Sequence, residues 1–134
     1  MDIRHLAPGL SVSPQLLAQD IAGLKQAGFR AIICNRPDGE GADQPLFSEI
    51  ERAAQEQGLQ ARYLPAESGK VTDEQGVLFG ELLASLPKPV LAYCRTGMRS
   101  TTMWALSEAN RQPLPQIACA AQEAGFDRCT GKAC

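Results

Sequence analysis

The chain has 134 residues, of which 44% are hydrophobic and 21% charged, and its formal net charge is −2. This length allows one domain, and the composition is that of a globular protein rather than a disordered or fibrous one. The negative charge argues against a surface for nucleic acid or anionic membrane. No apolar run approaches the roughly 20 residues of a membrane span. Because the first residues also lack the apolar core of a signal peptide, we expect a cytoplasmic protein without Sec-type export.

The five cysteines are an odd number, which together with the expected cytoplasmic location argues against a disulfide framework. Their spacings do not suit zinc, and the only histidine, His5, is distant in sequence from any cysteine pair. We therefore predict no metal and no cofactor. Cys34 is expected in the core, Cys119 on a helix face, and Cys129 and Cys134 near or in a polar tail over residues 127–134 that follows a single domain over 1–126.

Strand and helix signals alternate along the chain. Short apolar runs predict strands over 29–34, 61–65 and 90–93, and residues 3–12 are expected to add an edge strand or a hairpin. Apolar periodicity and capping residues predict helices over 14–27, 47–57, 72–86, 100–110 and 116–124. Ser13 and Pro14 look like the start of the first helix, whose inner face would hold Leu17, Ile21 and Leu24. Thr72 to Gln75 is a capping box for the third.

This alternation predicts an α/β fold, in one domain, with a mostly parallel central sheet of about four to five strands and helices on both faces. In such sheets the binding crevice lies beyond the carboxyl ends of the strands. Three loops leave those ends, over residues 35–41, 66–71 and 94–99. We therefore expect these loops to meet in space.

The third of these segments, residues 94–99, reads Cys-Arg-Thr-Gly-Met-Arg and is called here the cysteine loop. It joins a buried strand to a helix, so its N–H groups lack helical partners and form a site for an anion. Arg95, Thr96, Gly97, Met98, Arg99 and Ser100 are the expected anion-binding residues. A free cysteine is only about 3% thiolate at pH 7. The loop amides, the helix dipole and two arginines would favour the thiolate of Cys94, which predicts a nucleophile at the floor of this site.

Three segments of the chain resemble the small bacterial domain described as beta-lactamase hydrolase-like protein, phosphatase-like domain, whose members are also catalogued as sulfur transferases. The resemblance runs from about Leu10 to Ala124 and depends on residues 11–15, 35–40 and 89–100. It implies a fold like that of dual-specificity phosphatases, with Cys94 as the nucleophile.

The length of the cysteine loop favours sulfur transfer over phosphate hydrolysis. Four residues separate Cys94 from Arg99, one fewer than in cysteine phosphatases, and the pattern resembles the loop of rhodanese sulfurtransferases. Our first hypothesis is therefore a sulfurtransferase, in which Cys94 takes a sulfur from thiosulfate or a small persulfide and passes it to a thiol acceptor. The alternative is a phosphatase that forms a cysteinyl phosphate on Cys94. A third hypothesis is a non-catalytic module that binds an anion or a phosphopeptide at the same loop.

A phosphatase also needs a general acid to protonate the leaving oxygen. Dual-specificity phosphatases carry an aspartate for this in the loop after the preceding strand, and here that loop holds Glu67 instead. Glu67 is the nearest candidate and Asp38, on the adjacent loop, is the second. Asp38 and Glu40 also have plainer roles open to them, since Asp38 suits a turn and Arg36 could pair with Glu40 or orient the cysteine loop.

Overall fold

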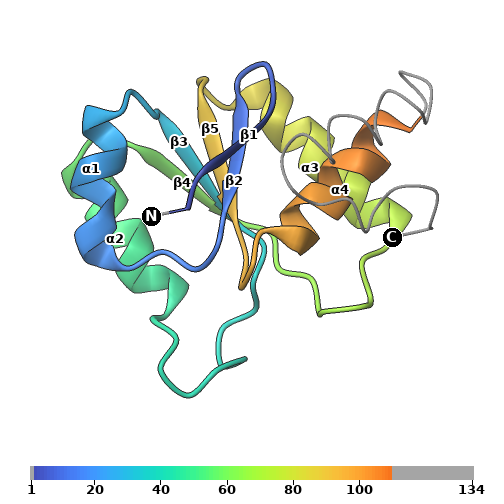
Figure 1. Cartoon of the computed structure of the whole chain (residues 1–134), viewed down its shortest axis with the longest axis horizontal. Coiled ribbons are helices and arrows are strands. Elements are labelled where there is room, and N and C mark those ends of the chain that lie inside the picture. Colours follow the sequence, from blue (N-terminus) through green and yellow to red (C-terminus); the bar gives the residue numbers. More distant parts are fainter. Residues whose placement is uncertain (1, 110–134) are drawn as a thin grey trace.

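The computed structural model describes residues 2–109, which form a five-stranded sheet in the order β1-β2-β5-β3-β4 (Figure 1). The first two strands form an antiparallel hairpin, and all other neighbours are parallel. The strands are β1 (Arg4–Ala7), β2 (Leu10–Ser13), β3 (Ala31–Cys34), β4 (Gln60–Tyr63) and β5 (Val90–Tyr93). The predicted fold class and the hairpin are confirmed.

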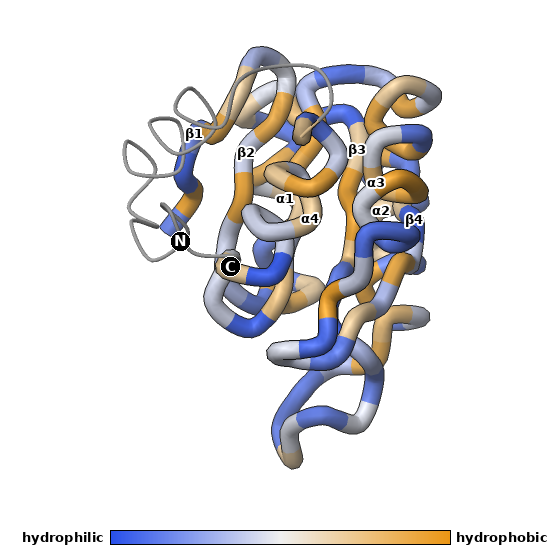
Figure 2. Tube along the Cα trace, turned by 90° about the vertical axis from the view of Figure 1, so that its right-hand side faces the viewer, coloured by the Kyte–Doolittle hydropathy of each residue, from blue (hydrophilic) through white to orange (hydrophobic). Residues whose placement is uncertain are grey.

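Helices cover both faces of the sheet (Figure 1). The 3-10 turn η1 (Ala18–Asp20), α1 (Ile21–Gln26) and α2 (Phe47–Glu56) lie on one face, and α3 (Asp73–Ser85) and α4 (Met98–Glu108) lie on the other. Side chains alternate across the sheet as the strand period requires. In β5, Leu91 and Tyr93 join the core beneath α1 and α2, whereas Val90 and Ala92 join the core beneath α3 and α4. Figure 2 shows the apolar strands inside and a polar loop projecting at the lower edge.

The predicted start of the first helix is wrong. Ser13 belongs to β2, where it pairs with Tyr93, and its carbonyl oxygen accepts a hydrogen bond from the Cys94 N–H at 3.4 Å. The helical turns begin only at Ala18. The residue before it, Leu17, donates a hydrogen bond from its N–H to the Asp20 carboxylate. Leu17, expected in the core, is 44% exposed, and Leu16 is buried in its place. Continued pairing with the central strand therefore outweighs the local helix signal.

The other signals hold within a few residues. The capping box of α3 is present, with the Gln75 N–H donating to Thr72 Oγ1 at 3.2 Å and the Thr72 N–H donating to Gln75 Oε1 at 2.9 Å. α4 begins at Met98, two residues earlier than predicted. The predicted helix over 116–124, the polar tail and Cys119, Cys129 and Cys134 lie outside the described residues.

α3 and α4 pack closely against each other. A Cβ on Gly76 of α3 would lie only 2.5 Å from the Cβ of Leu106 on α4, so glycine permits the contact. This packing fixes α4, and therefore the cysteine loop at its beginning, against the sheet. None of the helices formed by residues 2–109 is long and apolar enough to cross a membrane.

Candidate functional site

Four loops meet at the carboxyl edge of the parallel strands, at the bottom of Figure 1. They follow β2, β3, β4 and β5, and hydrogen bonds between their side chains and backbone join them. The predicted convergence of the loops after β3, β4 and β5 is confirmed, and Gln15 adds the segment that follows β2.

Cys94 lies at the floor of this edge, directly after β5. Its side chain is 0% exposed, and its Sγ accepts a hydrogen bond from the Gly97 N–H at 3.0 Å. Gly97 precedes the first residue of α4 and has a φ of 95°, a left-handed conformation that glycine adopts without a steric cost. This turn brings the N–H to the sulfur and directs the first amides of α4 to the same place, where helix N-termini favour negative charge. Because Cys94 is fully buried, its Sγ is not accessible to solvent in this structure.

Arg99, in the first turn of α4, is held from two other loops. Its Nη1 donates to Glu40 Oε2 and to the carbonyl oxygen of Ala66, both at 2.9 Å, and its Nη2 donates to Glu40 Oε1 at 2.7 Å. These bonds lower the pKa of Glu40 below its usual value, with the hydrogen bond from Arg99 as the main cause and Arg36 as a further one. Burial opposes the charge of Arg99, but the bond to Glu40 and the nearby sulfur of Cys94 raise its pKa overall.

A second arginine completes the network. Arg36 donates from Nε to Glu40 Oε1 at 2.8 Å and from Nη1 to Gln15 Oε1 at 3.0 Å. The predicted pairing of Arg36 with Glu40 is therefore present. Sequence reasoning missed the bond between Glu40 and Arg99, which are 59 positions apart, because the spacing along the chain gives no sign of which carboxylate reaches Arg99.

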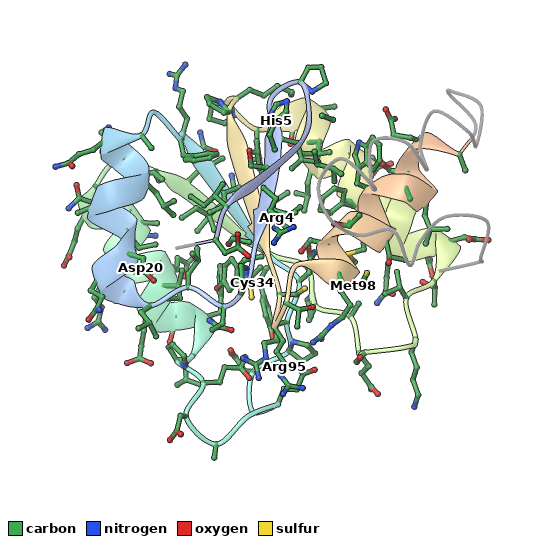
Figure 3. The ribbon with its side chains drawn as sticks, in the orientation of Figure 1. Arg4, His5, Asp20, Cys34, Arg95 and Met98 are labelled. Carbon is green, nitrogen blue, oxygen red and sulfur yellow. The ribbon has the colours of Figure 1, made fainter. Side chains whose placement is uncertain are left out.

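The remaining residues of the cysteine loop face different surroundings. Arg95 and Thr96 are exposed and Met98 is half-buried; Figure 3 shows Arg95 at the lower edge, below Cys34. Ser100 is fully buried, and its hydroxyl donates to Asn35 Oδ1 at 2.8 Å while Asn35 donates onward to the Leu64 carbonyl oxygen at 2.9 Å. The Ser100 hydroxyl proton is thus engaged within the protein, and its predicted role in anion binding stays a prediction.

The two candidate acids differ in their surroundings. Asp38 accepts a hydrogen bond from the Phe47 N–H at 2.8 Å and so satisfies one of the unpaired amides at the start of α2, which is a structural role. Glu67 follows Ala66 directly, its side chain is 71% exposed, and its carboxylate lies 3.5 Å from the Lys70 ammonium. Exposed pairs of this kind are weak, so the Glu67 carboxylate is less constrained than that of Asp38. The general acid stays a prediction.

Cys34 is a core residue, as predicted. It is 2% exposed, and its thiol donates to the Arg36 carbonyl oxygen at 3.3 Å. Burial raises the pKa of this thiol, and hydrogen bonds with Tyr93 and Arg36 offset the effect only in part. Across residues 2–109 no group of three His, Cys, Asp or Glu side chains is placed to hold a metal ion.

Comparisons with known proteins identify the family of this chain and agree with its fold. Residues 2–111 match the family described as beta-lactamase hydrolase-like protein, phosphatase-like domain. A curated beta-lactamase hydrolase-like protein of Agrobacterium fabrum is 31% identical over 122 residues, which are 90% of this chain and 28% of that protein. This chain thus spans less than a third of that relative.

Solved structures are also similar, among them the following two. A protein of Neisseria meningitidis, crystallised as a candidate phosphatase, is 33% identical with a TM-score of 0.86, over 100% of this chain and 99% of that one. Tk-PTP in its active form is 17% identical with a TM-score of 0.75, over 92% and 84% of the two chains, a likeness that concerns the fold.

Proposed function

Because the chain belongs to the family of beta-lactamase hydrolase-like protein, phosphatase-like domain, we propose that it is a phosphatase that works through a cysteinyl phosphate on Cys94. The expected resemblance is confirmed, and it bears on the choice between the two enzymatic hypotheses. The short cysteine loop favours sulfur transfer, whereas the family description and the relative of 33% identity favour the phosphatase.

The proposed reaction has two steps. The Cys94 thiolate attacks the phosphorus of a phosphate monoester, the bond to the leaving oxygen breaks, and Glu67 gives that oxygen its proton. Water then attacks the phosphorus, Glu67 takes a proton from this water, and the sulfur leaves as the thiolate with release of inorganic phosphate. Arg99 and the first amides of α4 balance the charge on the phosphoryl oxygens throughout.

The observation that carries the proposal is the placement of Arg99. Its guanidinium is buried, fixed by three hydrogen bonds, and carried by the first turn of α4, the helix that follows the turn after Cys94. A fixed guanidinium beside a nucleophile suits a transition state in which charge develops on oxygens held in the same place.

Hydrolysis of an aryl phosphate by the wild type and by Cys94→Ser tests this function. We expect turnover in the wild type and none above background in the variant. Cys34→Ser is the matched control, because it changes the other buried thiol of the described residues and keeps the nucleophile. Absence of wild-type turnover on every aryl phosphate tried would refute the proposal.

Sulfur transfer remains the second candidate, since four residues separate Cys94 from Arg99. A smaller loop suits a persulfide sulfur better than a tetrahedral phosphoryl group, and a sulfite leaving group needs no general acid. Thiosulfate should then add one sulfur to the wild type and none to Cys94→Ser, as intact mass would show.

A further inference from the structure

We propose that Glu40 is a positioning residue for the reaction: it sets the orientation of Arg99 so that one edge of the guanidinium is left open for two oxygens of the substrate. The inference deepens the proposed function and rests on it for the identity of the substrate, a phosphate monoester. It concerns a residue that sequence analysis associated only with Arg36.

The argument begins with the donors of Arg99. A guanidinium has five N–H groups in one plane. Glu40 and Ala66 together accept three hydrogen bonds, two from Nη1 and one from Nη2. The two N–H groups left are on Nε and Nη2, and neither donates a hydrogen bond to another group of residues 2–109.

The position of these two N–H groups follows from the geometry of the pair. Glu40 uses one oxygen on Nη1 and the other on Nη2, so it occupies the edge between the two terminal nitrogens. The remaining Nη2 N–H therefore points to the side of Nε, and the two free donors lie parallel on one edge. Such an edge binds two oxygens of a phosphoryl group at once. Glu40 thus leaves the anion-binding edge of Arg99 open.

Glu40 can hold Arg99 only because it is itself held. Arg36 donates to the same carboxylate oxygen that Arg99 Nη2 contacts, and Gln15 holds the other end of Arg36. Gly41 leaves room for this arrangement, since a Cβ there would lie 2.7 Å from Arg36 Nη2. Arg36 and Gln15 therefore support the orientation of Arg99 through Glu40, without contact with the substrate.

A different role for Glu40 would give the opposite result. If the carboxylate mainly masked the charge of Arg99, its removal would raise the affinity for anions. If it orients Arg99, removal lets the guanidinium turn and separates the two free N–H groups from the phosphoryl oxygens. The sign of the change in phosphate affinity therefore separates positioning from masking.

The experiment compares the wild-type chain of 134 residues with Glu40→Gln, Glu40→Ala and Gly41→Ala. Calorimetry with inorganic phosphate and steady-state kinetics with an aryl phosphate are the two readouts. We expect weaker phosphate binding in both Glu40 variants, and a kcat lower by about 10- to 100-fold, as for a misplaced catalytic group. Gly41→Ala, which displaces Arg36 and leaves Glu40 in place, should give a smaller loss of the same sign. Glu49→Gln, which alters the carboxylate at the start of α2, should match the wild type.

Tighter phosphate binding in Glu40→Ala, or an unchanged kcat in a variant that unfolds cooperatively, would overturn the inference. The phosphate readout needs no turnover. A wild type that hydrolyses no aryl phosphate would therefore refute the proposed function alone, while weaker phosphate binding in the Glu40 variants would still support the role of Glu40.

Discussion

Replacement of Gly97 by alanine tests whether the turn that brings an amide to the Cys94 sulfur is needed for activity. Gly97 has a φ of 95°, and its N–H donates to Sγ at 3.0 Å. A side chain in the left-handed region costs about 1–2 kcal/mol, which for a domain of this size lowers Tm by about 3 to 10 °C. Relief of this strain moves the N–H away from the sulfur. We therefore expect activity to fall by more than stability predicts, about 100-fold for a displacement near 1 Å.

Gly28→Ala is the matched control for this variant. Gly28 has a φ of 100°, and nothing lies within 4 Å of the position that its Cβ would take. It lies after α1, at the end of the sheet opposite the cysteine loop, so its substitution carries the same conformational cost without a contact to Cys94. Thermal unfolding and aryl phosphate hydrolysis should show similar losses of Tm in both variants but a loss of kcat only in Gly97→Ala. Equal kcat values at equal stability would refute the role given to the turn.

Arg99→Lys keeps a positive charge but cannot bind two oxygens on one planar edge. The kcat for an aryl phosphate should therefore fall by about 100- to 1,000-fold, the usual effect of a lost oxyanion donor. A fall in kcat of less than about tenfold would contradict this expectation. The pKa of Glu40 is lowered in the folded protein, so ionised Glu40 stabilises the fold above the ordinary glutamate pKa, and this stabilisation is lost as pH falls through the lower folded value. The fall in Tm at acid pH should therefore be smaller in Glu40→Gln than in the wild type. Identical profiles of Tm against pH would count against this reasoning. Gly76→Ala places a Cβ 2.5 Å from that of Leu106. The free energy of unfolding measured in urea should therefore fall by about 1–3 kcal/mol. An unchanged urea midpoint would show that α3 and α4 can move apart without a loss of stability.

The sequence predicts much of the fold because several local signals agree with the tertiary contacts. The apolar run over residues 90–93 has no polar face, as a strand covered on both sides requires, and it forms β5 with the predicted bounds. The capping box at Thr72 satisfies amides that no tertiary contact competes for. Where a tertiary contact does compete, as when Ser13 pairs beside Tyr93, the local signal fails.

The site was predictable in its parts but not in its connections. The strand, glycine and helix signals around residues 94–99 predict, without any knowledge of the fold, a turn whose amides have no helical partner, and the structure has this turn at Gly97. Which carboxylate reaches Arg99 depends on the path of a loop that begins after β3, and no periodicity encodes that path. The complete burial of Cys94 likewise depends on tertiary packing and not on the order of residues along the cysteine loop.

The central claim is that Cys94 accepts a phosphoryl group. The most direct test mixes the wild type with an aryl phosphate, stops the reaction within its first turnover and measures the intact mass and the modified peptide; a parallel sample receives thiosulfate. We predict one added phosphoryl group on the peptide that holds Cys94, absent in Cys94→Ser. A wild type that gains a sulfur from thiosulfate on Cys94 and never a phosphoryl group would contradict the account.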